Sequence, residues 1–213
     1  MIKEKKNPIA PLSLSTTKKY DGEDVKRQLL DDQHNKCYIC ERYLGTDFQI
    51  EHFKSRNNYP KLIQDWNNLL MSCSYCNGKK SNSFDNNVNP LSVNVEEEIE
   101  QRINLLNNKA EFKVRVDDAS HNETAKMLNM LYNGNEKIKI RKIKEECFFN
   151  NAMKLMNRFS RIINDFIMNP TPQNRSLVAC ELSIDKELLG FKYWMIHDNH
   201  LEKEFKDEIV WNK

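Results

Sequence analysis

The chain has 213 residues, of which 39% are hydrophobic and 30% are charged. This length can bury one good core or two small ones, and the charged fraction is ordinary for a soluble globular protein. No apolar run approaches the roughly 20 residues of a membrane helix, and no signal-peptide core follows the charged start MIKEKK. We therefore expect a cytoplasmic protein without a membrane segment.

The formal net charge is only +2, so the chain lacks the strong cationic field of a protein that binds nucleic acid on its own. We expect any such affinity to come partly from a partner. The chain also has six cysteines, and without an export signal they favour reduced thiols and metal binding over a disulfide framework.

The sequence divides into three regions. Residues 1–36 form an N-terminal arm and helix: two prolines indicate an extended arm over residues 1–20, and Val25 and Leu29 mark a short helix within residues 21–35. Residues 37–92 contain four of the cysteines. Residues 93–213 carry mostly helical patterns.

The four cysteines of the middle region form two Cys-x-x-Cys pairs, Cys37 with Cys40 and Cys73 with Cys76. Two such pairs can clamp one zinc ion tetrahedrally, and four thiolates leave no position open for water, so this zinc would be structural. The segment between the pairs is longer than the roughly 15 to 20 residues of the simplest four-cysteine signature, so it must fold on its own. We expect strands at residues 48–53 and 69–71 and a helix that begins at the second pair.

Residues with catalytic potential lie in and just after this segment. Glu51 directly precedes His52, Asn68 lies five residues before the second cysteine pair, and Asn77 directly follows that pair. The pattern resembles the HNH endonuclease family, whose ββα-metal core carries an acid–His pair on its first strand, a central Asn, and a His or Asn opening the helix. The chain would be the His-Asn-Asn form, with Glu51 in place of the commoner Asp.

The resemblance implies a metal-dependent nuclease and a role for each residue. Glu51 and Asn77 would hold a catalytic Mg²⁺ or Mn²⁺, since these ions prefer oxygen ligands. His52, with an unperturbed pKa near 6.5, would take the proton of the attacking water. Asn68 would tie the loop and orient this base, with Asn67 as its rival. Because neighbouring side chains on a strand point to opposite faces, we expect the strand to end or bulge at His52.

A more specific resemblance extends from about Pro8 to Leu91. The segments IEHF-x-S-R, DWNNLLMSCSYCN-x-KK and NPL are similar to the HNH proteins of retrons and of the Septu anti-phage system. This similarity implies the effector subunit of a bacterial anti-phage system, with a companion ATPase of the PtuA type that holds and controls the nuclease. The expected fold class is α+β, a zinc-stapled ββα-metal (HNH) core embedded in a mostly helical protein.

Four basic residues flank the proposed site and could meet phosphates: Lys54, Arg56, Lys79 and Lys80. A solvated surface charge is an equally good interpretation of any one of them. DNA is the first expected substrate. RNA stays open, because the 2′-hydroxyl contacts that separate the two cannot be identified in the sequence.

The alternative hypothesis is a non-catalytic four-cysteine zinc module that binds nucleic acid or protein. Taken alone, the cysteines favour that structural role. The presence of Glu51, His52, Asn68 and Asn77 at the family spacing favours the nuclease instead.

The C-terminal region begins with a predicted helix. Asn94 and Glu97 have the spacing of a capping box, and apolar residues follow at positions 95, 99, 103 and 106. We then expect a strand at residues 112–116. A second capping box, Ser120 with Glu123, predicts a helix that stops at Gly134.

The longest predicted helix covers residues 136–168, and two shorter ones follow at 177–182 and 188–196. Cys147 and Cys180 lie in apolar-periodic stretches, so we expect buried structural thiols without a role. His121 lies at a helix start and is the one further histidine that could approach a phosphate.

Overall fold

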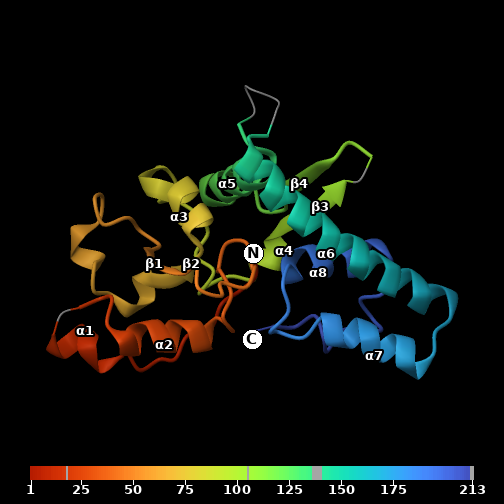
Figure 1. Ribbon diagram of the computed structural model, residues 1–213, viewed down its shortest axis with the longest axis horizontal. Coiled ribbons are helices and arrows are strands. Elements are labelled where there is room, and N and C mark those ends of the chain that lie inside the picture. Colours follow the sequence, from red (N-terminus) through yellow and green to blue (C-terminus); the bar gives the residue numbers. More distant parts are fainter. Residues whose placement is uncertain (18, 105, 136–140, 212–213) are drawn as a thin grey trace.

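The computed structural model describes residues 1–17, 19–104, 106–135 and 141–211. These residues form two small antiparallel sheets and a larger set of helices, which confirms the α+β class (Figure 1). The elements are α1 (Leu12–Thr16), α2 (Glu23–Asp32), β1 (Gln49–His52), β2 (Leu69–Ser72), α3 (Ser74–Lys80), α4 (Val95–Glu98), β3 (Ile99–Asn104), β4 (Lys109–Val114), α5 (Ala119–Asn133), α6 (Ile143–Met168), α7 (Pro172–Glu181) and α8 (Leu189–Asp198).

Strands β1 and β2 and helix α3 form a ββα unit. The two strands pair antiparallel, with Glu51 opposite Leu70 and His52 opposite Leu69. Strand β2 is buried along its whole length, and a single residue, Cys73, separates it from α3. Strand β1 ends at His52, as expected, and both strands lie within a residue or two of their predicted bounds.

The N-terminal arm packs along the body, but it is not extended throughout. Met1, Ile2 and Leu14 are buried. A short helix, α1, occupies Leu12–Thr16, and it leaves Leu12 and Ile9 exposed. The prediction of an extended arm is therefore wrong at Leu12–Thr16, where the chain forms a short helix that buries Leu14 and leaves Leu12 exposed.

The predicted helix after Asn94 is also wrong. Only one turn forms, α4, and the chain continues as β3, paired antiparallel with β4. The apolar residues at 95, 99 and 103 fit a helix, but Ile99, Gln101 and Ile103 equally fit the alternation of a strand. Pairing with β4 favours the strand over the helix for these residues. In addition, the Asn94 side chain makes no cap hydrogen bond that would support a longer helix.

Helix α5 ends where the sequence predicted but begins differently. Gly134 adopts a positive φ of 77° and its N–H donates to the carbonyl of Met130. At the other end, Asp118 is the N-cap, and its carboxylate accepts from the N–H groups of Ser120 and His121. The predicted capping box at Ser120 is therefore wrong, because the acidic residue two positions earlier takes its place.

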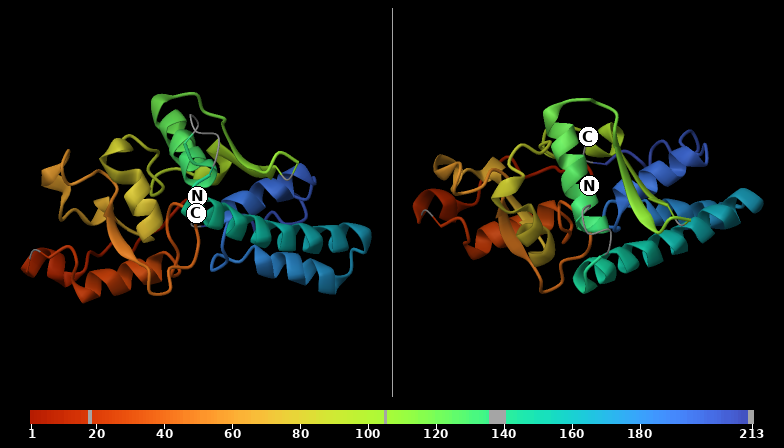
Figure 2. Two further views of the ribbon diagram at one scale, coloured as in Figure 1. Left: turned by 45° about the horizontal axis from the view of Figure 1, so that its top comes forward. Right: turned by 90° about the horizontal axis from the view of Figure 1, so that it is seen from above.

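The three remaining helices complete the C-terminal region. Helix α6 ends at Met168, before two prolines, while residues 136–140 of the predicted helix lie outside the described residues. Helix α7 runs beside α6 (Figure 2). Helix α8 packs against β3, and the Trp194 indole of α8 donates to the carbonyls of Glu96 and Ile99. Among the helices of the described ranges, none is both long and apolar enough to cross a membrane.

Two predictions about cysteines fail. Cys147 on α6 and Cys180 on α7 are exposed rather than buried. On α6 the neighbours Phe148 and Phe149 take the inward positions, so Cys147 faces solvent. An apolar stretch alone does not say which of its residues faces the core.

The ββα unit is anchored to the C-terminal region through α3 and the loop before the first cysteine pair. Tyr75 on α3 stacks on Phe148 at a ring-centroid distance of 4.5 Å, and its hydroxyl donates to the carbonyl of Leu131. Lys36 donates to the carbonyls of Ile184 and Lys186. These contacts fix one face of α3 and leave its other face beside β1.

Candidate functional site

The four predicted cysteine ligands meet in one buried cluster. Their sulfur atoms all lie within 4.8 Å of one another, and Cys40 Sγ is 4.0 Å from Cys73 Sγ. Cys37 and Cys40 lie in a tight loop, where the N–H of Glu41 donates to the carbonyl of Cys37. Cys73 caps α3 and Cys76 lies on its first turn, so the helix start presents the second pair to the first.

This cluster fits a tetrahedral metal ion. Zinc–sulfur bonds of about 2.3 Å place the sulfurs of a tetrahedral site about 3.8 Å apart, close to the observed separation. Burial raises the pKa of the Cys40 and Cys76 thiols, whereas hydrogen bonds from the other thiols lower the pKa of Cys73. Thiolates in such a buried place need a cation, and the half-buried Arg42 supplies only part of the compensating charge.

A separate small pocket lies between β1 and α3. It has a volume of about 110 Å³, and its lining includes Glu51, His52, Asn77 and Arg56. Its other lining residues are Ile50, Ser55, Ser81 and Asn82. Three of the four predicted catalytic residues therefore line one cavity, and the fourth, Asn68, is not among its lining residues.

The imidazole of His52 is held from two sides. Its Nε2 lies 3.0 Å from the carbonyl oxygen of Ile63, and its ring meets the ring of Tyr20 edge-on at a centroid distance of 4.8 Å. A carbonyl can only accept, so Nε2 carries the proton and Nδ1 keeps a free lone pair. Burial lowers the pKa of His52 below its ordinary value, with smaller contributions from Arg56 and Lys80.

Asn68 ties the loop that follows β1 to the start of β2. Its Oδ1 accepts from the N–H of Lys54 at 2.7 Å, and its Nδ2 donates to the carbonyls of Lys54 and Leu62 at 3.0 and 3.1 Å. Leu62 directly precedes Ile63, whose carbonyl oxygen contacts His52, so Asn68 holds the same loop that holds the His52 ring. The neighbouring Asn67 is exposed and makes none of these contacts, so the geometry favours Asn68 over its rival.

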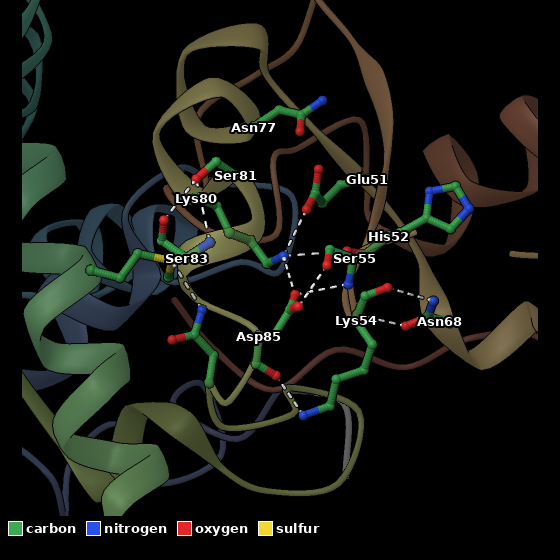
Figure 3. Close-up of polar contacts among 12 residues, drawn as sticks. Glu51, His52, Lys54, Ser55, Asn68, Asn77, Lys80, Ser81, Ser83 and Asp85 are labelled. Atoms are coloured by element: carbon green, nitrogen blue, oxygen red, sulfur yellow. Dashed lines mark hydrogen bonds and ion pairs between the residues drawn. The ribbon is translucent and has the colours of Figure 1, made fainter. Parts of the chain in front are cut away.

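Glu51 and Asn77 each have one side-chain atom engaged by a neighbour. The Lys80 ammonium donates to Glu51 Oε1 at 2.8 Å, and Asn77 Nδ2 donates to Gln49 Oε1 at 2.6 Å. In Figure 3 the other carboxylate oxygen of Glu51 lies on the side of Asn77. Burial raises the pKa of Glu51, and the positive charge of Lys80 offsets part of that effect.

The four cations predicted to contact phosphate have different environments. Arg56 is exposed, lines the pocket and donates to the hydroxyl of Tyr20 at 2.9 Å. Lys54 donates to the carbonyl of Asp85, and Lys79 pairs with Glu145 on the other side of α3. Lys80 is completely buried, so the interpretation of this residue as a surface contact to phosphate was wrong.

His121 is not available to a phosphate either. The ring is buried between two carboxylates, with Nε2 at 2.6 Å from Glu98 and Nδ1 at 2.8 Å from Asp118. Burial opposes its protonation, but these two carboxylates together raise the pKa of His121. His121 therefore links the start of α5 to Glu98 of α4, a structural role.

The sequence pattern missed Tyr20 and Asp85. Tyr20 reaches His52 and Arg56 from the segment between α1 and α2, and Asp85 follows α3 and binds the loop that carries Arg56. No local motif marks either residue. Only the folded chain brings them into contact with residues that line the pocket, Tyr20 with His52 and Arg56, and Asp85 with Ser55.

Comparison with known proteins finds similarity in the region that carries the cysteine cluster and the pocket. Residues 37–83 match the model of the HNH family, described as HNH endonuclease. The chain is 40% identical over 70 residues to Septu protein PtuB of Bacillus thuringiensis. The aligned part covers 32% of this chain and 27% of that relative, so the chain spans little more than a quarter of its length.

Proposed function

We propose, from the premise that residues 37–83 are an HNH endonuclease domain, that this protein is a metal-dependent nuclease that hydrolyses phosphodiester bonds of nucleic acid. The observation that carries the proposal is the single pocket shared by Glu51, His52 and Asn77. A zinc module that only binds does not require these three residues to line one cavity.

The residues that would hold the catalytic ion are Glu51 and Asn77. Lys80 engages only Oε1 of Glu51, and Gln49 accepts from only Nδ2 of Asn77, so each residue keeps an oxygen for a ligand. Carboxylate and carboxamide oxygens suit Mg²⁺ or Mn²⁺. When bound, such an ion neutralises charge on the phosphate and stabilises the leaving oxygen.

His52 would act as the general base. With its proton on Nε2, its Nδ1 can take a proton from the attacking water. The lowered pKa keeps the ring neutral, and therefore able to accept, at neutral pH. Asn68 would hold the loop whose Ile63 carbonyl fixes this tautomer, without touching the ion itself.

The cysteine cluster would hold a structural zinc ion distinct from the catalytic ion. Cys37, Cys40, Cys73 and Cys76 supply four soft sulfur ligands, which suit zinc and leave no position for water. Since two of these ligands lie at the start of α3, the zinc would fix the helix that carries Asn77.

Arg56 is the residue that we expect to bind the phosphate of the substrate. Arg56→Ala should raise the KM for nucleic acid about tenfold, because a charge-assisted hydrogen bond contributes about 1.5 kcal/mol. Steady-state cleavage measures this, with Arg27→Ala on the exposed face of α2 as the charge-matched control. An unchanged KM for Arg56→Ala would remove Arg56 from the site.

We also propose that the nuclease is the effector of a bacterial anti-phage system, and that it works in the cytoplasm with a companion ATPase. The similarity to Septu protein PtuB supports the first part. The net charge of +2 supports a partner that brings the nuclease to nucleic acid.

The substrate is identified by incubating the purified protein with plasmid DNA, single-stranded DNA and RNA, with and without the companion ATPase. The proposal predicts cleavage of DNA, alone or with the ATPase. Cleavage of RNA alone would keep the nuclease and change its substrate. Intact DNA and RNA under both conditions would favour the zinc module that only binds.

A further inference from the structure

A buried chain of charges lies directly beneath the pocket. The Lys80 ammonium donates to Glu51 Oε1 at 2.8 Å and to the backbone carbonyl of His52 at 3.2 Å, and it lies 3.9 Å from Asp85 Oδ1 (Figure 3). The Lys80 side chain is 0% exposed and that of Glu51 is 8% exposed. The three donors of one ammonium thus face three oxygens from β1 and from the segment after α3.

Asp85 extends this chain to the loop that carries Arg56. Its Oδ1 accepts from the N–H of Ser55 at 2.8 Å, and its Oδ2 accepts from the Ser55 hydroxyl and from Asn58 Nδ2, both at 2.6 Å. These bonds hold the pKa of the Asp85 carboxyl below its ordinary value, although burial acts against them. The same carboxylate therefore fixes Lys80 on one side and the residues around Arg56 on the other.

Stability alone is a weak reason for such an arrangement. A buried ion pair loses the hydration of both charges, and a well-packed apolar pair of similar volume is often as stable. The chain nevertheless places a lysine at a buried position that contacts both the Glu51 carboxylate and the backbone of His52. What the ammonium adds, and an apolar side chain would not, is a fixed orientation of the Glu51 carboxylate.

We propose that Lys80 is a positioning residue of the divalent-ion site: it holds Oε1 of Glu51 and the backbone of His52, so that Oε2 of Glu51 faces the pocket, and Asp85 fixes Lys80 in turn. The inference rests on the proposed function, since it concerns the ion that Glu51 and Asn77 would hold. It adds a residue outside the Glu-His-Asn-Asn set and replaces the role first predicted for Lys80.

The direction of change in ion affinity tests this role. Removing a positive charge beside Glu51 should by electrostatics alone strengthen binding of a divalent cation. If Lys80 positions Glu51, Lys80→Met should instead weaken Mn²⁺ binding, by about 10- to 100-fold, as is typical when a partner of a metal ligand is removed. Electron paramagnetic resonance of free Mn²⁺ measures this with zinc-loaded protein and needs no substrate.

Lys79→Met is the matched control, since it removes the same charge from the next residue of α3, where the ammonium pairs with Glu145. Its Mn²⁺ affinity should stay within about twofold of the wild type or rise slightly. Equal or tighter Mn²⁺ binding by folded Lys80→Met would overturn the proposal.

Asp85→Asn provides the second test if Lys80→Met does not fold, as judged by zinc content and circular dichroism. It keeps the shape of the side chain but weakens its hold on Lys80 and on Ser55. The proposal predicts weaker Mn²⁺ binding together with a higher KM for nucleic acid, whereas a lower melting temperature with unchanged Mn²⁺ affinity would contradict it. If the wild type binds Mn²⁺ but cuts no nucleic acid either alone or with the companion ATPase, the nuclease proposal fails while these affinities still decide the role of Lys80.

Discussion

His52→Ala is expected to lose cleavage while the protein keeps its fold and its zinc. General-base catalysis contributes about 10²- to 10⁴-fold to a rate, so the single-turnover rate should fall by that amount. The zinc should be retained, because the buried ring of His52 contacts Tyr20 and the Ile63 carbonyl and lies outside the cysteine cluster.

His52→Gln separates the chemistry from the structure. Its amide N–H can still donate to the Ile63 carbonyl, but a carboxamide cannot take a proton from water. Both variants should therefore be equally inactive, with wild-type zinc content. Substantial cleavage by His52→Gln would show that His52 acts by shape alone.

The same prediction has a pH dependence. Only the neutral ring of His52 accepts a proton, so protonation of the ring should stop catalysis. Because burial lowers the pKa of His52, this protonation should occur at a lower pH than for an ordinary histidine. The rate should thus rise with pH on the acid side, with a midpoint below the ordinary value of 6.5, and level off before neutrality. This limb of the single-turnover profile should be absent from the residual activity of His52→Ala.

Cys73→Ser is expected to lose zinc and most of the folded structure. Structural zinc sites contribute roughly 10 to 16 kcal/mol in small zinc domains, which is comparable to the whole stability of an ordinary domain. Cys73 also caps α3, so its loss affects the ion and the helix together. Zinc content by atomic absorption and the melting temperature measure the effect.

Cys147→Ser is the matched control for that prediction. Cys147 is exposed on α6 and lies outside the cluster, so zinc content and melting temperature should equal those of the wild type. A Cys73→Ser protein with one zinc per chain and an unchanged melting temperature would refute the assignment of four ligands.

The sequence was most informative where chemistry requires fixed spacing. Two Cys-x-x-Cys pairs that bind one ion have to fold so that their sulfurs converge. The Glu51-His52 pair lies on strand β1 between the two pairs, and Asn77 directly follows the second pair on helix α3. Asn68 could be separated from Asn67 by its interval to Asn77. These short-range constraints do not depend on the rest of the fold.

The remaining features depend on contacts between distant parts of the chain. Residues 99–104 fit a helix and a strand equally well until β4 pairs with them. Lys80 is indistinguishable from Lys79 in sequence. In the folded chain, however, the Lys80 side chain is directed inward to Glu51, and that of Lys79 pairs with Glu145 on the other side of α3. Tyr20 and Asp85 contact the pocket residues His52 and Ser55 only through tertiary structure, so no motif could have identified them.

A catalytic ion held by Glu51 is tested most directly by the dependence of cleavage on Mg²⁺, measured for the wild type and for Glu51→Ala after removal of weakly bound ions with EDTA. The wild type should show no cleavage in EDTA and saturable activation by Mg²⁺, and Glu51→Ala should keep its zinc but require much more Mg²⁺. Cleavage in EDTA, or equal activity of the two proteins at limiting Mg²⁺, would contradict a catalytic ion held by Glu51.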